Sequence, residues 1–193
     1  MEADWQFEIG GDAPIIDACW PGFVDLRWNA PSGPDLRAQV GSLQEAAQLP
    51  GLAFALERLN SYHSPVWTSK CDFWPALQPG DFDADELDAP TGSFAHAAGC
   101  YIDLLPKTDQ RWTHPRDAAA VCKNWCALLQ AVPLRCSRVD LIIRRALIAP
   151  DQTEIGITAY LTACGSTSVA AWQTLEAALA AFVDALGAHS TLQ

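Results

Sequence analysis

Residues 136–165 read CSRVDLIIRRALIAPDQTEIGITAYLTACG, and this stretch decides the fold. It contains two runs rich in β-branched residues, 139–148 and 155–163, on either side of a Pro-Asp turn. The odd positions in both runs are mostly apolar, and the even positions are mostly polar. Alternation with a period of two predicts an antiparallel hairpin that buries one of its faces.

The buried face limits the register of this hairpin, because a slip of one residue would turn every side chain to the other face. A short turn at 149–153 leaves two registers. One places Cys136 opposite Cys164, and the other places Arg138 opposite Cys164. Both registers put the same six polar side chains on one face: Arg138, Asp140, Arg144, Thr158, Tyr160 and Thr162.

The rest of the chain shows the same alternation of strand and helix patterns. Period-two runs predict strands at 5–9, 15–16, 23–28, 65–74 and 99–105, and apolar residues three and four apart predict helices at 35–48, 52–60, 115–132 and 169–186. The order strand–strand–helix thus occurs three times, over 5–60, 65–132 and 136–188. We expect one α+β domain over 1–193, with a mainly antiparallel sheet of about six strands, helices on one face and repeated ββα units.

Composition excludes some classes of protein. Half of the 193 residues are hydrophobic and only 18% are charged, which argues against disorder. The net charge is −11, with no clustered basic residues, so we expect no nucleic-acid partner. The first ten residues carry acids where a signal peptide needs basic residues, and Glu176 and Asp184 interrupt the most apolar stretch, 169–186. We therefore expect a cytoplasmic protein that does not associate with membranes.

The polar face of the sheet is the candidate site. If Lys70, Asp72 and Asp103 reach the face that carries Arg138, Asp140, Arg144 and Tyr160, a platform of both charge signs results. Basic side chains on it would hold a carboxylate or phosphate, and aspartates would orient a hydroxyl or an amine. We therefore predict binding of a small anionic or zwitterionic metabolite. The same pattern also fits a solvated face with weak ion pairs, or an interface for a second copy or another partner.

The thiols give weaker signals. The seven cysteines show no C-x-x-C spacing, so we expect free thiols and no metal or cofactor. Cys164 precedes a helix and could act as a nucleophile, but the sequence ties no base to it. Cys122 and Cys126 are helical neighbours, best explained by packing. No catalytic residue can be named.

Two other features suggest structure more than chemistry. Asp81, Asp83 and Asp85 match the start of a calcium-binding loop, but Glu86 and Gly92 stand where a glycine and a bidentate glutamate are required, so we predict an acidic loop. Most of the eight tryptophans are expected in the core, while three at strand ends or in loops could border a pocket or an interface: Trp20, Trp74 and Trp112.

Overall fold

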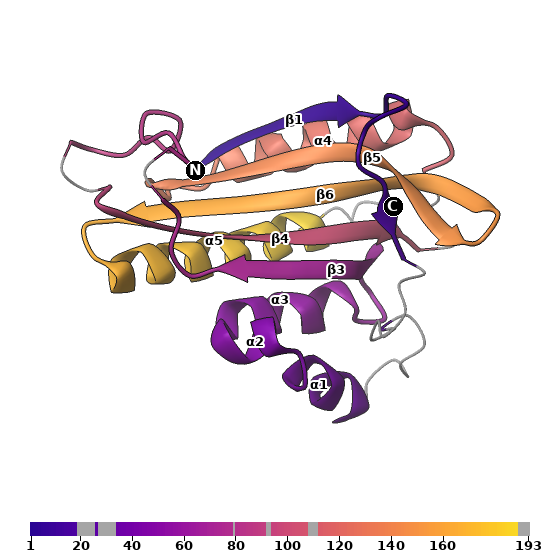
Figure 1. Cartoon of the computed structure of the whole chain (residues 1–193), viewed down its shortest axis with the longest axis horizontal. Helices are drawn as coiled ribbons and strands as arrows, with labels where there is room; N and C mark the ends of the chain where they lie inside the picture. The colour runs from indigo at the N-terminus through magenta and orange to yellow at the C-terminus, as the bar shows by residue number, and fades with distance from the viewer. Residues whose placement is uncertain (19–25, 27–33, 79, 92–93, 108–111, 189–193) are drawn as a thin grey trace.

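The computed structural model describes residues 1–18, 26, 34–78, 80–91, 94–107 and 112–188. The fold is α+β, with six strands and five helices within these ranges (Figure 1). The strands are β1 (Glu2–Glu8), β2 (Ile16–Asp17), β3 (Val66–Trp74), β4 (His96–Pro106), β5 (Ser137–Ala149) and β6 (Gln152–Gly165). The helices are α1 (Pro34–Gly41), α2 (Gln44–Gln48), α3 (Pro50–Leu59), α4 (Pro115–Gln130) and α5 (Ser168–Ala188).

The sheet is mixed, which corrects the expectation of a mainly antiparallel sheet. Its order is β1-β5-β6-β4-β3, and the short strand β2 also pairs with β5. Both β1 and β2 run parallel to β5, whereas the β5–β6, β6–β4 and β4–β3 pairs are antiparallel. Alternation reveals which face is buried but not which strand is the neighbour. The first two strands pair with β5 and not with each other, so strand pairing does not show a repeated ββα unit.

The central hairpin adopts the first of the two registers. Arg138 lies opposite Thr162 and Asp140 opposite Tyr160, and the backbone N–H of Cys164 donates to the carbonyl oxygen of Cys136 at 2.9 Å. A register shift between Leu147 and Ala149 precedes the turn. The predicted parity therefore holds along the length that carries the candidate residues.

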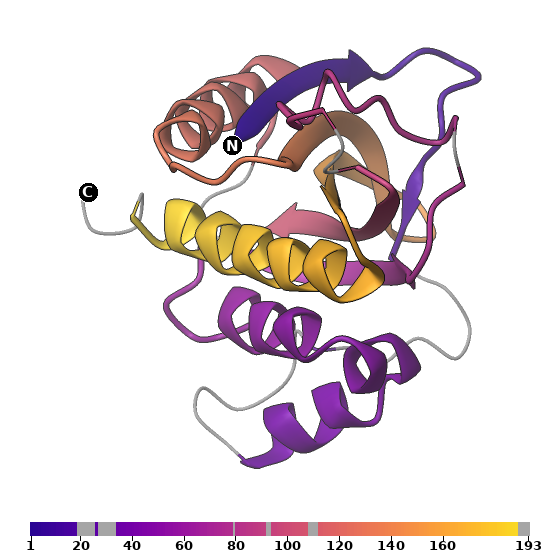
Figure 2. The ribbon, with the colours of Figure 1, turned by 90° about the vertical axis from the view of Figure 1, so that its left-hand side faces the viewer.

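Helices α3, α4 and α5 form one layer on a single face of the sheet (Figure 2). Helix α4 packs against β1 and β5, and α5 packs against β4 and β6. The main core lies between the two layers and contains fully buried side chains such as Leu104, Leu141, Ile157, Trp125, Leu179 and Phe182. Within the described ranges, no helix covers the opposite face of the sheet.

Helix α5 is long and apolar enough to cross a membrane by length and composition alone, but a core helix meets the same criteria. Here Leu175, Leu179 and Phe182 are fully buried in the main core. Helices α3 and α5 approach closely where Gly51 donates its N–H to Oε1 of Glu176 at 3.3 Å. A Cβ at Gly51 would lie 2.9 Å from Cγ of Glu176, so this contact requires glycine. The helix is therefore an integral part of the core.

Some element boundaries differ from the predicted ones. The helix expected over 35–48 is divided into α1 and α2, and Ser42 at the break donates its hydroxyl to the carbonyl of Gln39 at 2.6 Å. The N-cap of α4 is His114, whose backbone N–H donates to the Asp117 carboxylate at 3.0 Å, and Thr113 donates its hydroxyl to the same carboxylate at 3.2 Å. The strand expected at 23–28 lies outside the described residues except for Leu26, which is buried.

Two small apolar clusters bound the sheet face that the helices leave uncovered. At one end, where β2 crosses in front of the sheet (Figure 1), Ile16, Ala18, Trp67, Leu105 and Ala146 pack together. At the other end, Leu87 from the loop after β3 covers Ala97 and Cys164. The space between these two clusters holds the candidate site.

Candidate binding site

A hollow of about 350 Å³ lies on the uncovered sheet face, beside β2. Its lining comes from five strands and from the residue that precedes β2. The lining combines both charge signs with aromatic and aliphatic side chains: Ile15, Ile16, Asp17, Lys70, Trp74, Tyr101, Asp103, Arg144 and Tyr160.

Four of the seven predicted site residues line this hollow: Lys70, Asp103, Arg144 and Tyr160. The other three lie outside its lining. Arg138 forms an ion pair of 2.8 Å with Asp140 and a longer one of 3.7 Å with Glu86. Asp72 lies opposite Tyr101 and accepts the N–H of Phe73 at 2.7 Å.

The carboxylate of Asp103 is the most deeply buried charge-bearing group of the hollow. Its residue is only 6% exposed, and Oδ1 accepts a hydrogen bond of 2.6 Å from the hydroxyl of fully buried Thr158. Burial raises the pKa of Asp103 above its ordinary value, although the Thr158 hydrogen bond and the positive charges of Arg144 and Lys70 oppose this shift. Asp103 therefore takes up a proton more readily than an exposed aspartate does.

Arg144 organises the hydroxyl groups around Asp103. Its Nε and Nη2 donate to Oε2 of Glu8, which belongs to β1, at 2.9 and 2.5 Å. Its Nη1 donates to the hydroxyl oxygens of Thr158 and Tyr160 at 3.2 and 3.3 Å. Because these oxygens accept from Arg144, their own protons point elsewhere. The Thr158 proton goes to Asp103, and the Tyr160 hydroxyl is oriented as a donor.

Three aromatic rings form a continuous wall across β3, β4 and β6. The centroid of Tyr101 lies 5.8 Å from that of Trp74 and 5.8 Å from that of Tyr160. The rings of Trp74 and Tyr160 are nearly parallel, with an interplanar angle of 10°. Burial and the nearby carboxylate of Asp103 raise the pKa of Tyr101 to about 12, so its hydroxyl stays protonated near neutral pH. We call these three residues the aromatic wall.

A β-bulge in β3 explains how Lys70, Asp72 and Trp74 reach this face. The register shifts between Thr68 and Cys71. Before the shift, Thr68 faces the helices, where its N–H donates to Oδ1 of Asn60 at 2.9 Å. After it, Asp72 and Trp74 lie opposite Tyr101 and Gly99. The uniform alternation predicted for 65–74 is therefore wrong, because the extra residue changes the parity of the strand.

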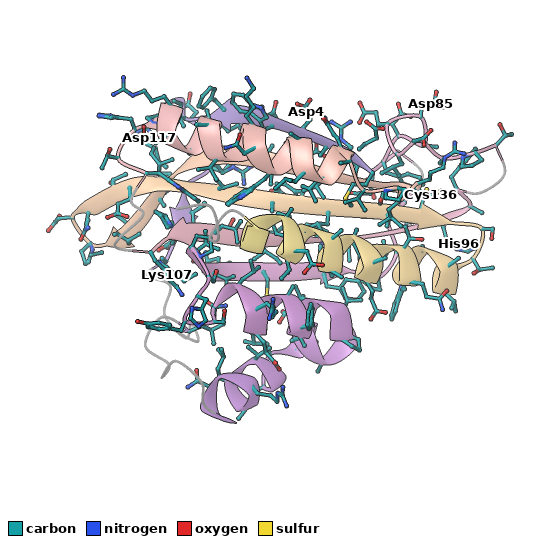
Figure 3. The ribbon with its side chains drawn as sticks, turned by 180° about the vertical axis from the view of Figure 1, so that it is seen from behind. Asp4, Asp85, His96, Lys107, Asp117 and Cys136 are labelled. Carbon is teal, nitrogen blue, oxygen red and sulfur yellow. The ribbon has the colours of Figure 1, made fainter. Side chains whose placement is uncertain are left out.

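No cysteine of the described residues belongs to the lining of the hollow. Cys164 is fully buried next to Cys136, and burial raises its pKa to about 12, opposite to the shift that a nucleophile needs. The nearby pair of His96 Nδ1 and Ser168 Oγ, 3.2 Å apart, is exposed at the start of α5 (Figure 3). Cys122 and Cys126 are buried in α4, and the described residues contain no cluster of three metal-ligating side chains.

Carboxylates of the acidic loop at 81–88 accept hydrogen bonds from nearby backbone N–H groups. Asp81 accepts the N–H of Gln78 at 2.9 Å, and Asp83 accepts that of Asp85 at 2.9 Å. Asp88 binds Arg135 through two hydrogen bonds of 2.8 and 3.1 Å, which ties the loop to the residues before β5. These contacts are those of an anchored loop.

Sequence reasoning missed several residues of the site. Tyr101 shares the parity of Asp103 and was identifiable from that alone. Glu8 and the segment of Ile15, Ile16 and Asp17 gave no such signal, because their place depends on the parallel pairing with β5. Trp74, expected only to border a pocket or an interface, lines the hollow.

Comparison of the chain with models of protein families, with curated proteins and with solved structures finds no match.

Proposed function

We propose that this protein binds a small zwitterionic metabolite in the hollow. The observation that carries the proposal is the burial of Asp103 beside an aromatic wall, with Lys70 on the neighbouring strand β3. A merely solvated face would leave such a carboxylate in water, because burying a charge is unfavourable. Perturbed carboxylates in a hollow are more typical of binding and catalytic sites than of structural surfaces.

The balance of charge favours a zwitterion over a simple anion. Arg144 is paired with Glu8 and Arg138 with Asp140, so both arginines already have carboxylate partners. The lining of the hollow adds two further carboxylates, Asp17 and Asp103, to the ammonium of Lys70. A ligand that carried only negative charge would meet this surplus of acid, whereas a zwitterion places its cation beside the buried Asp103 carboxylate and brings no net negative charge into the hollow.

A thermal-shift screen of amino acids, amines, carboxylates and phosphates tests the proposal. A ligand at about 100 times its dissociation constant adds about 2.7 kcal/mol to the free energy of unfolding. For a chain of this size, that corresponds to a rise of roughly 5–10 °C in the melting temperature. We expect zwitterions to raise the melting temperature, and Lys70→Met and Asp103→Asn to abolish the shift. Arg135→Ala and Asp184→Asn remove exposed charges elsewhere and serve as matched controls. If no zwitterion shifts the wild type, or the control variants lose the effect equally, the proposal fails.

The second candidate function is assembly through the same face, which is favoured by the 55% exposure of Ile15 at the border of the hollow. Growth by adding strands at the sheet edges is disfavoured. On β1 the Asp4 side chain accepts the N–H of Trp5 at 2.8 Å, and on β3 Asn60 and Asp72 accept edge N–H groups. Light scattering tests face-to-face assembly. A wild-type dimer that the substitution Ile15→Lys converts to monomer would support it, and a strict monomer at high concentration would exclude self-association.

A further inference from the structure

The surroundings of Asp103 narrow the class of ligand, on the basis of the proposed function. Thr158, a neutral group, donates to Oδ1, and the positive charges of Arg144 and Lys70 only partly offset the effect of burial on the Asp103 carboxylate. The guanidinium behind it, that of Arg144, is bound to Glu8. A cation delivered by the ligand would complete this arrangement, because buried carboxylates are stable when paired with a charge and hydrogen-bonded.

The aromatic wall adds a second requirement. Trp74, Tyr101 and Tyr160 line the hollow from three neighbouring strands together with Asp103, and their rings contact one another. Ring faces attract cations and stack against flat ligands. The same attraction already operates within the protein, where Cζ of Arg144 lies 5.6 Å from the centroid of the Tyr160 ring. We infer that the ligand is an aromatic primary amine, with its ammonium on Asp103, its ring on the aromatic wall and any carboxylate towards Lys70.

The size of the hollow agrees with this class. Its volume of about 350 Å³ lies at the lower end of the range for small-molecule sites, about 300–1,000 Å³. An aromatic amino acid or its decarboxylated amine fits such a space, whereas a dinucleotide does not. The exposed Ile15 and buried Ile16 at the β2 side give the ring an apolar border.

Binding of an ammonium to Asp103 is linked to the proton on that carboxyl. The groups that surround Asp103 are Lys70, Cys71 and Asp72 from β3, Tyr101 from its own strand, Arg144 from β5 and Tyr160 from β6, with Asp17 from β2 on the lining. Because burial raises the pKa of Asp103, the free protein keeps a proton there to a higher pH than it would on an exposed aspartate. Affinity for the amine should therefore increase with pH as the proton leaves.

Calorimetric titration with L-tryptophan, tryptamine and indole-3-propionate separates the two charged ends. We expect L-tryptophan and tryptamine to bind, and indole-3-propionate, which lacks the amine, to bind at least about 10-fold more weakly. Asp103→Asn should weaken tryptamine at least about 10-fold and remove the rise of affinity between pH 4 and pH 8. Lys70→Met should weaken L-tryptophan but leave tryptamine unchanged, and Asp184→Asn is the control.

The outcomes distinguish this inference from the proposed function. If a zwitterion without a ring binds and depends on Lys70 and Asp103, the proposed function stands and the aromatic-amine class is wrong. Equal affinity for tryptamine and indole-3-propionate, or tryptamine binding that is insensitive to Asp103→Asn, also refutes the inference. Far-ultraviolet circular dichroism of each variant, together with its unfolding midpoint, shows that a loss of binding does not come from loss of the fold.

Discussion

Replacing Gly156 by alanine tests how β2 is held over the sheet face. A Cβ at this position would lie 2.7 Å from Cδ1 of Ile16, 2.9 Å from Cδ2 of Leu105 and 3.1 Å from the carbonyl oxygen of Leu104. Carbon atoms normally approach no closer than about 3.5–4.0 Å. The two side chains can move, but the carbonyl belongs to the neighbouring strand and cannot. The added methyl group must therefore push the side chains of Ile16 and Leu105 aside and crowd the carbonyl of Leu104, which loosens the packing of β2 on the sheet.

The sign of the change in the free energy of unfolding shows whether Gly156 is a crowded position or an unstrained one. Gly→Ala at an unstrained position stabilises a protein by about 0.4–1 kcal/mol, because the unfolded chain loses freedom. An overpacked site instead loses about 1–3 kcal/mol. We expect Gly156→Ala to lower the free energy of unfolding by about 1–3 kcal/mol, measured by urea denaturation at 25 °C. The control is Gly187→Ala in α5, where a Cβ meets nothing within 4 Å, and it should not destabilise the protein.

A second substitution identifies the clash. Ile16→Val removes the Cδ1 atom, and alone it should cost about 0.5–1.5 kcal/mol. In the Gly156→Ala background the same change relieves the 2.7 Å contact, so it should cost less or even stabilise, with a coupling free energy of about 0.5–3 kcal/mol. Additive effects, or a Gly156→Ala variant as stable as the wild type, would refute the packing of β2 against the sheet.

Three further predictions follow from the buried groups. Thr158→Val should lower the free energy of unfolding by about 1–3 kcal/mol at neutral pH, because Asp103 loses its donor, whereas Thr158→Ser should retain most of the stability. The pKa of Asp103 is higher in the native than in the unfolded protein, so between these two values the free energy of unfolding should fall as pH rises, by at most ~1.4 kcal/mol per pH unit. Urea titrations at several pH values measure this dependence, which Asp103→Asn should lack. At pH 8 the native Cys164 thiol, with its pKa of about 12, should react with iodoacetamide roughly 1,000-fold more slowly than an exposed cysteine, as measured by mass spectrometry; rapid labelling of the folded protein would contradict its burial.

Local patterns predicted the parts of the site that depend on one strand pair. The alternation in β5 and β6 placed Arg138, Asp140, Arg144 and Tyr160 on one face, and their register is the first of the two predicted. Such patterns succeed because a buried face admits only one parity. The helices were located for the same reason, since each presents one apolar stripe to the core.

The remaining features depend on contacts between distant residues. Glu8 pairs with Arg144 across 136 positions of sequence, and nothing near either residue encodes that pair. The pairing of β1 and of β2 with β5 likewise joins segments that are far apart in the sequence, so local patterns do not predict it. The bulge at Thr68–Cys71 was missed because a single inserted residue leaves the alternation on each side intact while it exchanges the faces.

The contrast between the two arginines of the face supports placing the proposed binding site around Arg144. The Arg138 side chain is 22% exposed and its partner Asp140 32%, so this pair is partly solvated and contributes little to stability. Arg144 is 12% exposed, and it holds the hydroxyls that serve Asp103 and the aromatic wall. Apolar residues of similar size around Arg144 would stabilise the fold at least as well, since buried polar networks rarely stabilise more than good packing does. The sequence instead keeps a buried carboxylate with a raised pKa next to three rings and an open volume, a combination that stability alone does not explain.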